Sequence, residues 1–140
     1  MAQLAEFIGN HLLLSAAFII VFFMVIMLFM SEKMQAFANA NTSELTHLVN
    51  RKDAVVIDTR DIADYKQGHI VNAINIPLAD MVSGKTSLDK YKGKEVIAYC
   101  ASGMSSKLAC KHLIKSGIEN VYNLAGGINA WKSDNLPVVK

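Results

Sequence analysis

The sequence is poor in the residues that build disulfide-linked or metal-linked folds. It contains 2 cysteines in 140 residues, Cys100 and Cys110, which is too few for a disulfide framework. The 4 histidines, His11, His47, His69 and His112, are dispersed, and none forms a zinc-type cluster with cysteine. We therefore expect no structural metal and no bound cofactor.

The sequence also lacks a large excess of basic or acidic residues. The chain has 14 Lys and Arg against 12 Asp and Glu, a formal net charge of +2. This excess is too small and too scattered for a nucleic-acid surface or a polybasic membrane patch. We expect no nucleic-acid partner. The length suits one globular domain and not two.

Charge is missing altogether from one segment near the N-terminus. Residues 12–30 contain no Asp, Glu, Lys or Arg, and Ser15 is their one hydroxyl residue. As a helix, this run would be about 28 Å long, close to the roughly 30 Å hydrocarbon core of a bilayer. The sequence predicts a transmembrane helix over 12–30, preceded by a short extracytoplasmic N-terminus over 1–11. A juxtamembrane linker is expected over 31–42.

A secretory signal peptide is the alternative for this segment. Signal peptides begin with a basic region and have an apolar stretch of about 7–15 residues. Here residues 1–11 contain no Lys or Arg, and the apolar run is longer. The possible cleavage sequence Ala38-Asn39-Ala40 lies beyond the charged Glu32 and Lys33. These features favour an uncleaved, single-pass anchor.

The basic residues around the span predict its orientation. None precedes the span, whereas Lys33 follows it directly and Arg51 and Lys52 come later. Basic residues accumulate on the cytoplasmic side of membrane spans. We therefore expect the domain to face the cytoplasm from a bacterial-type inner membrane.

Short apolar runs alternate with helix-like segments over residues 43–140, which we take as the folded domain. The expected strands are 54–58, 73–76, 95–99 and 120–124, and the expected helices are 43–49, 61–66, 78–82, 104–116 and 128–133. This alternation predicts an α/β domain with a small, mainly parallel sheet flanked by helices.

Cys100 lies where such a sheet would carry a site. It follows the strand expected over 95–99 and precedes a loop that leads into a helix. Ligands bind beyond the carboxyl ends of parallel strands, and loop N–H groups and a helix N-terminus stabilise a thiolate there. Cys100 is thus a candidate nucleophile, with an inert buried cysteine as the alternative. Cys110 shares an apolar helix face with Leu113, which favours core packing over a resolving thiol.

Four motifs resemble, in order and spacing, those of the rhodanese family. They are Val56–Arg60 with Tyr65–Ile70, then Asn72–Pro77, the loop Tyr99–Ser106, and the closing Gly126–Trp131. Membrane-tethered members of the family also look similar over the full length. The resemblance implies a sulfurtransferase in which the Cys100 thiolate takes sulfane sulfur from thiosulfate or a persulfide. A thiol, cyanide or protein acceptor then removes it.

The resemblance also assigns roles to the residues around Cys100. The substrate-binding loop would comprise Ala101, Ser102, Gly103, Met104, Ser105 and Ser106. Structural support would come from Asp58, Arg60 and His69.

One position departs from the family pattern. The loop often reads Cys-x-x-Gly-x-Arg, and Ser105 stands where that arginine would be. A guanidinium supplies charge and a fork of donors for an anion, whereas a serine supplies one hydroxyl. We therefore expect weak thiosulfate turnover and favour persulfide relay between proteins. The alternative is a catalytically weak interaction module with a membrane-protein partner. A phosphatase is disfavoured, because neither Ser105 nor Ser106 can clamp a phosphate as arginine does.

Overall fold

The computed structural model describes residues 11–33 and 37–140, and the side chains of residues 29–33 lie outside that description. The chain divides into two compact units, residues 1–35 and 36–140. Of the N-terminus predicted over 1–11, residues 1–10 lie outside the described part.

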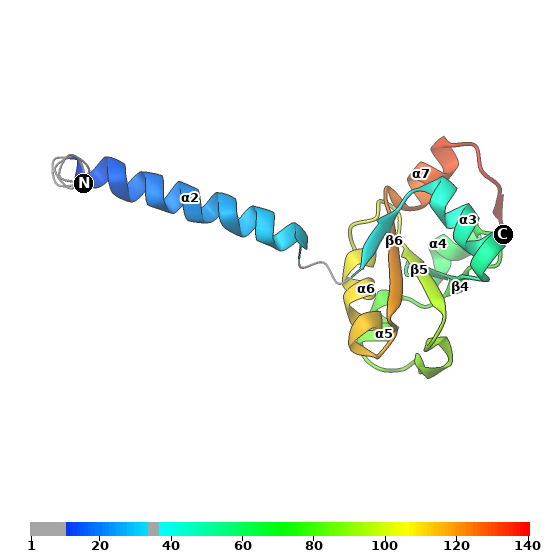
Figure 1. Ribbon diagram of the computed structural model, residues 1–140. Coiled ribbons are helices and arrows are strands. Elements are labelled where there is room, and N and C mark those ends of the chain that lie inside the picture. Colours follow the sequence, from blue (N-terminus) through cyan, green and yellow to red (C-terminus); the bar gives the residue numbers. More distant parts are fainter. Residues whose placement is uncertain (1–10, 34–36) are drawn as a thin grey trace. The chain divides into compact units, whose positions relative to one another are not determined.

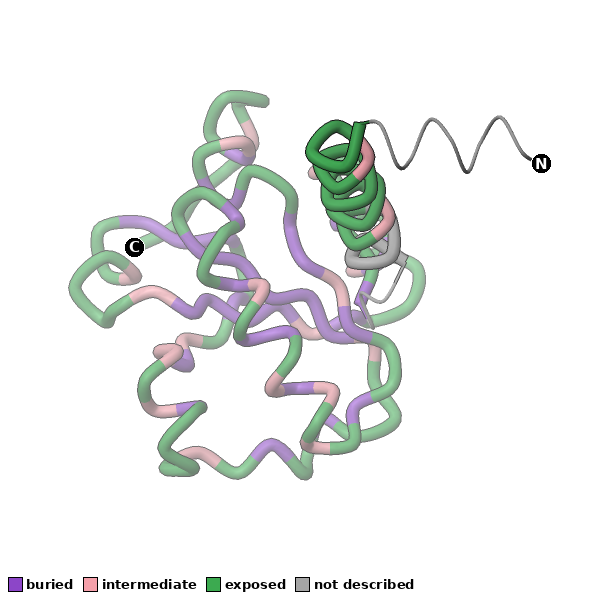
Figure 2. Tube along the Cα trace, turned by 90° about the vertical axis from the view of Figure 1, so that its left-hand side faces the viewer, coloured by how far each residue is buried: buried purple, intermediate pink, exposed green. Residues whose placement is uncertain are grey.

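The first unit contains helix α2 (Leu12–Lys33), which covers the predicted span. Its described side chains are exposed, apart from the partly exposed Ser15 and Ile26, as the green helix in Figure 2 shows. Among the described residues, no helix meets both the length and the hydropathy needed to cross a membrane. The predicted helix is therefore present, and its membrane role stays a prediction.

The second unit is built on a parallel sheet of five strands in the order β1-β6-β5-β2-β4 (Figure 1). The strands are β1 (Ala38–Ala40), β2 (Val55–Asp58), β4 (Ile74–Asn75), β5 (Glu95–Tyr99) and β6 (Asn120–Leu124). In the register, Val56 lies opposite Ile97 and Ala98 lies opposite Asn123. The predicted α/β domain with a parallel sheet is confirmed.

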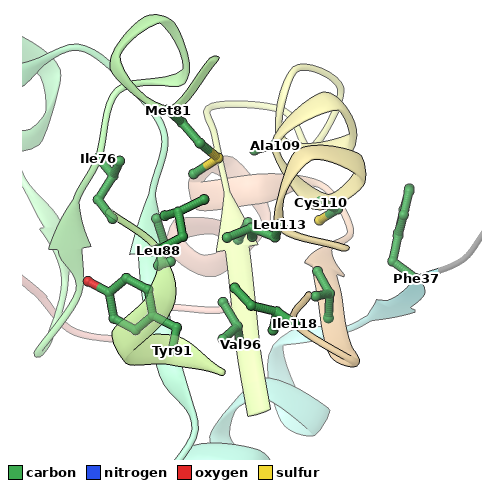
Figure 3. Packing of buried hydrophobic residues seen from close by; sticks show 13 residues of the cluster. Phe37, Ile76, Met81, Leu88, Tyr91, Val96, Ala109, Cys110, Leu113 and Ile118 are labelled. Carbon is green, nitrogen blue, oxygen red and sulfur yellow. The ribbon is translucent and has the colours of Figure 1, made fainter. Parts of the chain in front are cut away.

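Helices cover both faces of the sheet (Figure 1). Helices α5 (Leu78–Val82) and α6 (Ser106–Lys115) pack on one face, and α3 (Thr42–Lys52), α4 (Ile62–Gln67) and α7 (Gly127–Ser133) pack on the other. Strand β5 alternates between two core clusters, because successive side chains of a strand point to opposite faces. Val96 and Ala98 join the α5–α6 cluster of Figure 3, and Ile97 and Tyr99 join the other.

The predicted linker over 31–42 is wrong at its C-terminal end. Strand β1 occupies residues 38–40 and pairs in parallel with β6, and Phe37 just before it is buried. Helix α3 likewise begins at Thr42, because the cap is Asn41 and not Ser43. The Asn41 side chain accepts from Glu44 N–H while the Glu44 carboxylate accepts from Asn41 N–H, which forms a capping box.

Three further short elements were not predicted. Strand β3 (His69–Ile70) pairs antiparallel with β7 (Val138–Val139), and η1 (Asp89–Tyr91) is a single 3₁₀ turn. Helix α6 begins at Ser106 and not at residue 104. The residues between β5 and α6 instead form the loop that surrounds the Cys100 sulfur.

Candidate active site

Cys100 is the first residue after β5, at the carboxyl edge of the sheet. It is 3% exposed, so its sulfur lies recessed in the loop that connects β5 to α6. This is the position at which parallel sheets bind ligands. The ten residues of α6 direct their N-terminal, partly positive end toward this loop.

The Cys100 sulfur accepts hydrogen bonds from the loop. The Gly103 N–H donates at 3.1 Å, and the Ser106 hydroxyl lies 3.4 Å from the sulfur. Burial alone would raise the pKa of Cys100. The hydroxyls of Ser105 and Ser106 and the N–H groups of Ser106 and Ser102 outweigh it and lower the pKa to about 7. At neutral pH a large fraction of Cys100 is therefore thiolate, the nucleophilic form of cysteine.

The loop is held in place by the start of α7. The N–H groups of Ile128 and Asn129 donate to the carbonyls of Cys100 and Ala101 at 2.9 and 3.1 Å. A Cβ at Gly127 would collide with the carbonyl oxygen of Cys100 and with Ala101. Glycine at 127 is thus required for this close approach, which fixes the backbone on which the reactive sulfur sits.

A buried polar network continues from the sulfur into the sheet. The Ser106 hydroxyl donates to Asn123 Oδ1 at 2.6 Å, and both residues are almost fully buried. Asn123 Nδ2 donates to the Gly103 carbonyl at 3.2 Å and to Asn39 Oδ1 at 3.0 Å. Sequence reasoning missed Asn123 and Asn39. The available signal was an asparagine inside the otherwise apolar second half of the strand over 120–124.

The predicted substrate-binding residues differ in exposure. Gly103 and Ser106 are buried against the Cys100 sulfur. Ala101, Ser102, Met104 and Ser105 are exposed and form the outer surface of the loop. Met104 and Leu108, one helical turn apart, add exposed apolar side chains beside it. A molecule that approaches the sulfur would therefore contact a mixed apolar and hydroxyl surface.

The predicted support residues brace the strand before the loop. Arg60 forms a two-point ion pair with the fully buried Asp58, with Nη2 to Oδ2 at 2.6 Å, and also donates to the Gly68 carbonyl. The Arg60 guanidinium lies 5.7 Å from the centre of the Tyr99 ring. His69 stacks on Tyr65 with ring centroids 3.7 Å apart. None of these contacts reaches the Cys100 sulfur, and the one that touches β5 is that of Arg60 with the Tyr99 ring.

Cys110 lies within α6, on the face that packs against the sheet. Its side chain is fully buried among the residues of Figure 3, and its sulfur donates to the Tyr122 carbonyl at 3.5 Å. Burial raises the pKa of Cys110 to about 12, and the neighbouring Cys100 adds to the rise. Both cysteines are free thiols. The contacts of Cys110 are those of a core residue.

Two hollows in the second unit lie away from Cys100. One, of about 450 Å³, lies between α3 and the chain after α7 and includes His47, Arg51 and Asp134 in its wall. The other, of about 270 Å³, lies between β1 and α3. In the described part of the chain, no group of three His, Cys, Asp or Glu residues could hold a metal ion.

Comparison with known proteins adds to this geometry. Residues 41–134 match the family model for the rhodanese-like domain. The Escherichia coli K12 protein YibN is 32% identical over 141 residues, a match that covers 100% of this chain and 99% of YibN. The thiosulfate sulfurtransferase GlpE of Coxiella burnetii is 37% identical over 90 residues, which cover 64% of this chain and 82% of GlpE.

A solved structure is similar as well. The crystal structure of a rhodanese-related protein from Thermoplasma volcanium aligns with a TM-score of 0.61 at 28% identity. The alignment covers 74% of this chain and 98% of that protein. The family model and the solved structure therefore both relate this chain to rhodanese-like proteins.

Proposed function

This chain belongs to the rhodanese-like domain family, and we propose that it is a sulfurtransferase that carries sulfane sulfur as a persulfide on Cys100. The observation that carries the proposal is the Cys100 sulfur itself. It lies at the carboxyl edge of the sheet, accepts a hydrogen bond from the Gly103 N–H, lies 3.4 Å from the Ser106 hydroxyl, and has a pKa lowered to about 7. The named activity of the relative GlpE is of the same kind.

The proposed reaction has two displacement steps. The Cys100 thiolate attacks the outer sulfur of a donor and forms a new S–S bond. The donor's own S–S bond breaks, and its remaining part leaves with the electron pair, as sulfite if the donor is thiosulfate. An acceptor thiolate then attacks the outer sulfur of the Cys100 persulfide and releases Cys100 as a thiolate. The same loop donors that stabilise the thiolate would stabilise the anionic persulfide.

Ser105 points to the class of donor. Its hydroxyl helps to lower the pKa of Cys100, but it brings no positive charge toward an incoming dianion. A donor that carries less charge than thiosulfate, such as a protein or low-molecular-weight persulfide, suits this loop better. We therefore place persulfide relay between thiols above thiosulfate turnover.

The test is intact-mass spectrometry of the full-length chain in mild detergent. The chain is treated with thiosulfate and, separately, with a low-molecular-weight persulfide. We expect an adduct of about 32 Da, one sulfur atom, that forms faster with the persulfide. The adduct should be lost in Cys100→Ser and kept in Cys110→Ser.

Failure of both donors to load a folded chain with a reactive Cys100 would contradict sulfur carriage. The second candidate, a protein-interaction module of low catalytic activity, would then take its place. The absence of a guanidinium at Ser105 is the observation that favours this candidate. Equal loss of the adduct in both cysteine variants would contradict the single-thiol mechanism.

We also infer that residues 12–30 attach the domain to a bacterial-type inner membrane, with the domain in the cytoplasm. Support comes from the uncharged run in the sequence and from the exposed apolar side chains of α2. The test is alkaline carbonate extraction of cell membranes, with a chain that lacks residues 1–35 as control. The full chain should stay in the pellet, and digestion of spheroplasts should leave the domain intact. Release into the supernatant would contradict anchoring, and cleavage would contradict the orientation.

A further inference from the structure

The Ser106 hydroxyl has one proton and two neighbours that can accept it. Asn123 Oδ1 lies 2.6 Å from Ser106 Oγ, and the Cys100 sulfur lies 3.4 Å away. A hydroxyl donates one hydrogen bond at a time. The short distance assigns the proton to Asn123, and a Cys100 thiol can then donate its own S–H to Ser106 Oγ. When Cys100 is ionised, the two acceptors compete for the Ser106 proton.

The orientation of the Asn123 amide is fixed by its other contacts. Its Nδ2 donates to the Gly103 carbonyl at 3.2 Å and to Asn39 Oδ1 at 3.0 Å. A flipped amide would place Oδ1 against the Gly103 carbonyl and would present two donors to Ser106. Asn123 is 1% exposed and Ser106 is fully buried, so water does not replace either partner. The competition is therefore built into the packed interior.

We propose that Asn123 is a positioning residue for Cys100, because it holds the Ser106 proton and so limits how strongly that hydroxyl stabilises the Cys100 thiolate. The hydrogen bonds of Asn123 go to Ser106, Gly103 and Asn39 and not to the Cys100 sulfur, so it acts through Ser106. The proposal deepens the sulfurtransferase role proposed above. Its consequence is that Cys100 ionises near neutral pH, where the fraction of thiolate and the intrinsic nucleophilicity of the sulfur are best balanced for sulfur exchange.

The groups around Cys100 allow the competition for the Ser106 proton to be measured through the ionisation of Cys100. Within the described residues, the titratable group that acts on Cys100 is the Cys110 thiol on α6, and burial keeps it neutral with a pKa of about 12. The other groups that act on the sulfur are the hydroxyls of Ser105 and Ser106 and the N–H groups of the loop. None of these titrates between pH 5 and 9. A shift in the ionisation of Cys100 therefore reports on hydrogen bonding.

The experiment measures the rate of iodoacetamide modification of Cys100 against pH, by peptide mass spectrometry of the full-length chain. No sulfur donor is present, so the result is independent of whether the chain transfers sulfur. Ser106→Ala removes the donor and should move the midpoint up by about one pH unit. Asn123→Ala removes the competing acceptor and should move the midpoint down by about half a unit.

The double variant distinguishes positioning from general support. If Asn123 acts through Ser106, adding Asn123→Ala to Ser106→Ala should leave the midpoint of Ser106→Ala unchanged. Asn39→Ala is an intermediate variant, because it removes one of the two contacts that fix the Asn123 amide and leaves the contact with the Gly103 carbonyl. Its midpoint should shift less than that of Asn123→Ala.

An upward shift of the Cys100 midpoint in Asn123→Ala would overturn the proposal. So would a shift by Asn123→Ala that is the same in the Ser106→Ala background as in the unmodified chain. If Asn123→Ala does not fold, Asn123→Val serves instead, since a β-branched side chain suits a strand and fills the space of the amide. The same downward shift is expected there, and its absence in a folded Asn123→Val chain would equally overturn the proposal.

Discussion

At Cys100, burial and hydrogen bonding act on the thiol in opposite directions. The residue is 3% exposed, and burial alone disfavours the thiolate. The hydroxyls of Ser105 and Ser106 together with loop N–H groups reverse the balance and bring the pKa to about 7. Cys110 is more deeply buried and lacks such a set of donors, and burial raises its pKa to about 12. The local hydrogen bonds thus make one of two buried cysteines reactive.

The ionisation of Cys100 predicts a pH profile for the unmodified chain. Because the pKa lies near 7, the rate of iodoacetamide modification should increase as pH rises through 7 and level off about one unit above it. Cys110 should stay unmodified over this range. Peptide mass spectrometry measures both sites in one sample. A midpoint for Cys100 near 8.5, the value of an ordinary thiol, would contradict the hydrogen-bonded thiolate.

Ser105→Arg should raise the kcat/KM for thiosulfate by about tenfold, since a charge-assisted hydrogen bond to a dianion adds roughly 1.5 kcal/mol. Steady-state assays with thiosulfate and cyanide measure the effect. Ser105→Ala is the matched control, because it removes the hydroxyl without adding charge, and it should give no increase. Unchanged thiosulfate turnover in Ser105→Arg would mean that the missing charge does not limit the reaction.

The sequence could predict Cys100 but not its network. A cysteine between an apolar strand and a helix defines a position at the sheet edge without any knowledge of neighbours. Asn123 and Asn39 reach the site only through the order of the strands, because β6 lies between β5 and β1. The pairing of Ala98 with Asn123 sets which polar side chain lies under the loop. A single sequence does not contain that register.

At the scale of elements, the loop between β5 and α6 is clamped between α6 and the start of α7. Gly103 has φ +83°, and a Cβ there would lie 2.8 Å from the Leu124 carbonyl oxygen and 3.0 Å from Gly126 N. The Gly103 N–H also donates to the Cys100 sulfur. Backbone conformation, packing and the reactive thiol therefore depend on the same residue.

Gly103→Ala should lower the free energy of unfolding by about 3 kcal/mol, because it combines a left-handed backbone with a collision against fixed backbone atoms. Gly93→Ala is the control. Gly93 has φ +76° but nothing within 4 Å of a Cβ, so it should lose about 1 kcal/mol from backbone strain alone. Urea unfolding followed by circular dichroism measures both. Equal losses would show that the loop can move away from the new methyl group.

The strands that the sequence predicts are those with apolar, β-branched residues. Strands β2, β4, β5 and β6 were expected from such runs, and the structure contains all four, with β4 limited to Ile74–Asn75. Strand β1 was missed because Ala38-Asn39-Ala40 has low strand propensity and reads as linker. Residues 38–40 form a strand because they pair in parallel with residues 122–124 at the open edge of β6. This is tertiary context, which local pattern does not carry.

For the whole molecule, the boundary of the folded unit lies before the matched family region. Residues 37–40 contribute the buried Phe37 and the edge strand β1, and both precede residue 41. A fragment over 41–140 would expose the edge of β6 and leave a gap in the core cluster of Figure 3. Residues 37–40 therefore pack as part of the domain, although the sequence predicts a linker there.

A fragment over 36–140 should therefore be more stable than one over 41–140, by at least about 3 kcal/mol, the usual cost of losing a buried phenylalanine. Urea unfolding of the two fragments measures the difference. The longer fragment with Phe37→Ala separates the side chain from the strand and should lie between the two. Equal midpoints for both fragments would mean that β1 and Phe37 add nothing to the fold.

Strand β1 also determines how a mechanical load would enter the domain. It is the first element after the N-terminal helix, it lies at the edge of the sheet, and it pairs with β6 through three residues. Tension along the chain from the N-terminus therefore reaches the edge strand before any central strand. The Asn39–Asn123 hydrogen bond would break with that strand, whereas the Cys100 sulfur would keep its bond to Gly103. A load from the N-terminus would thus act first on the edge strand, while the reactive loop follows a central strand later in the chain.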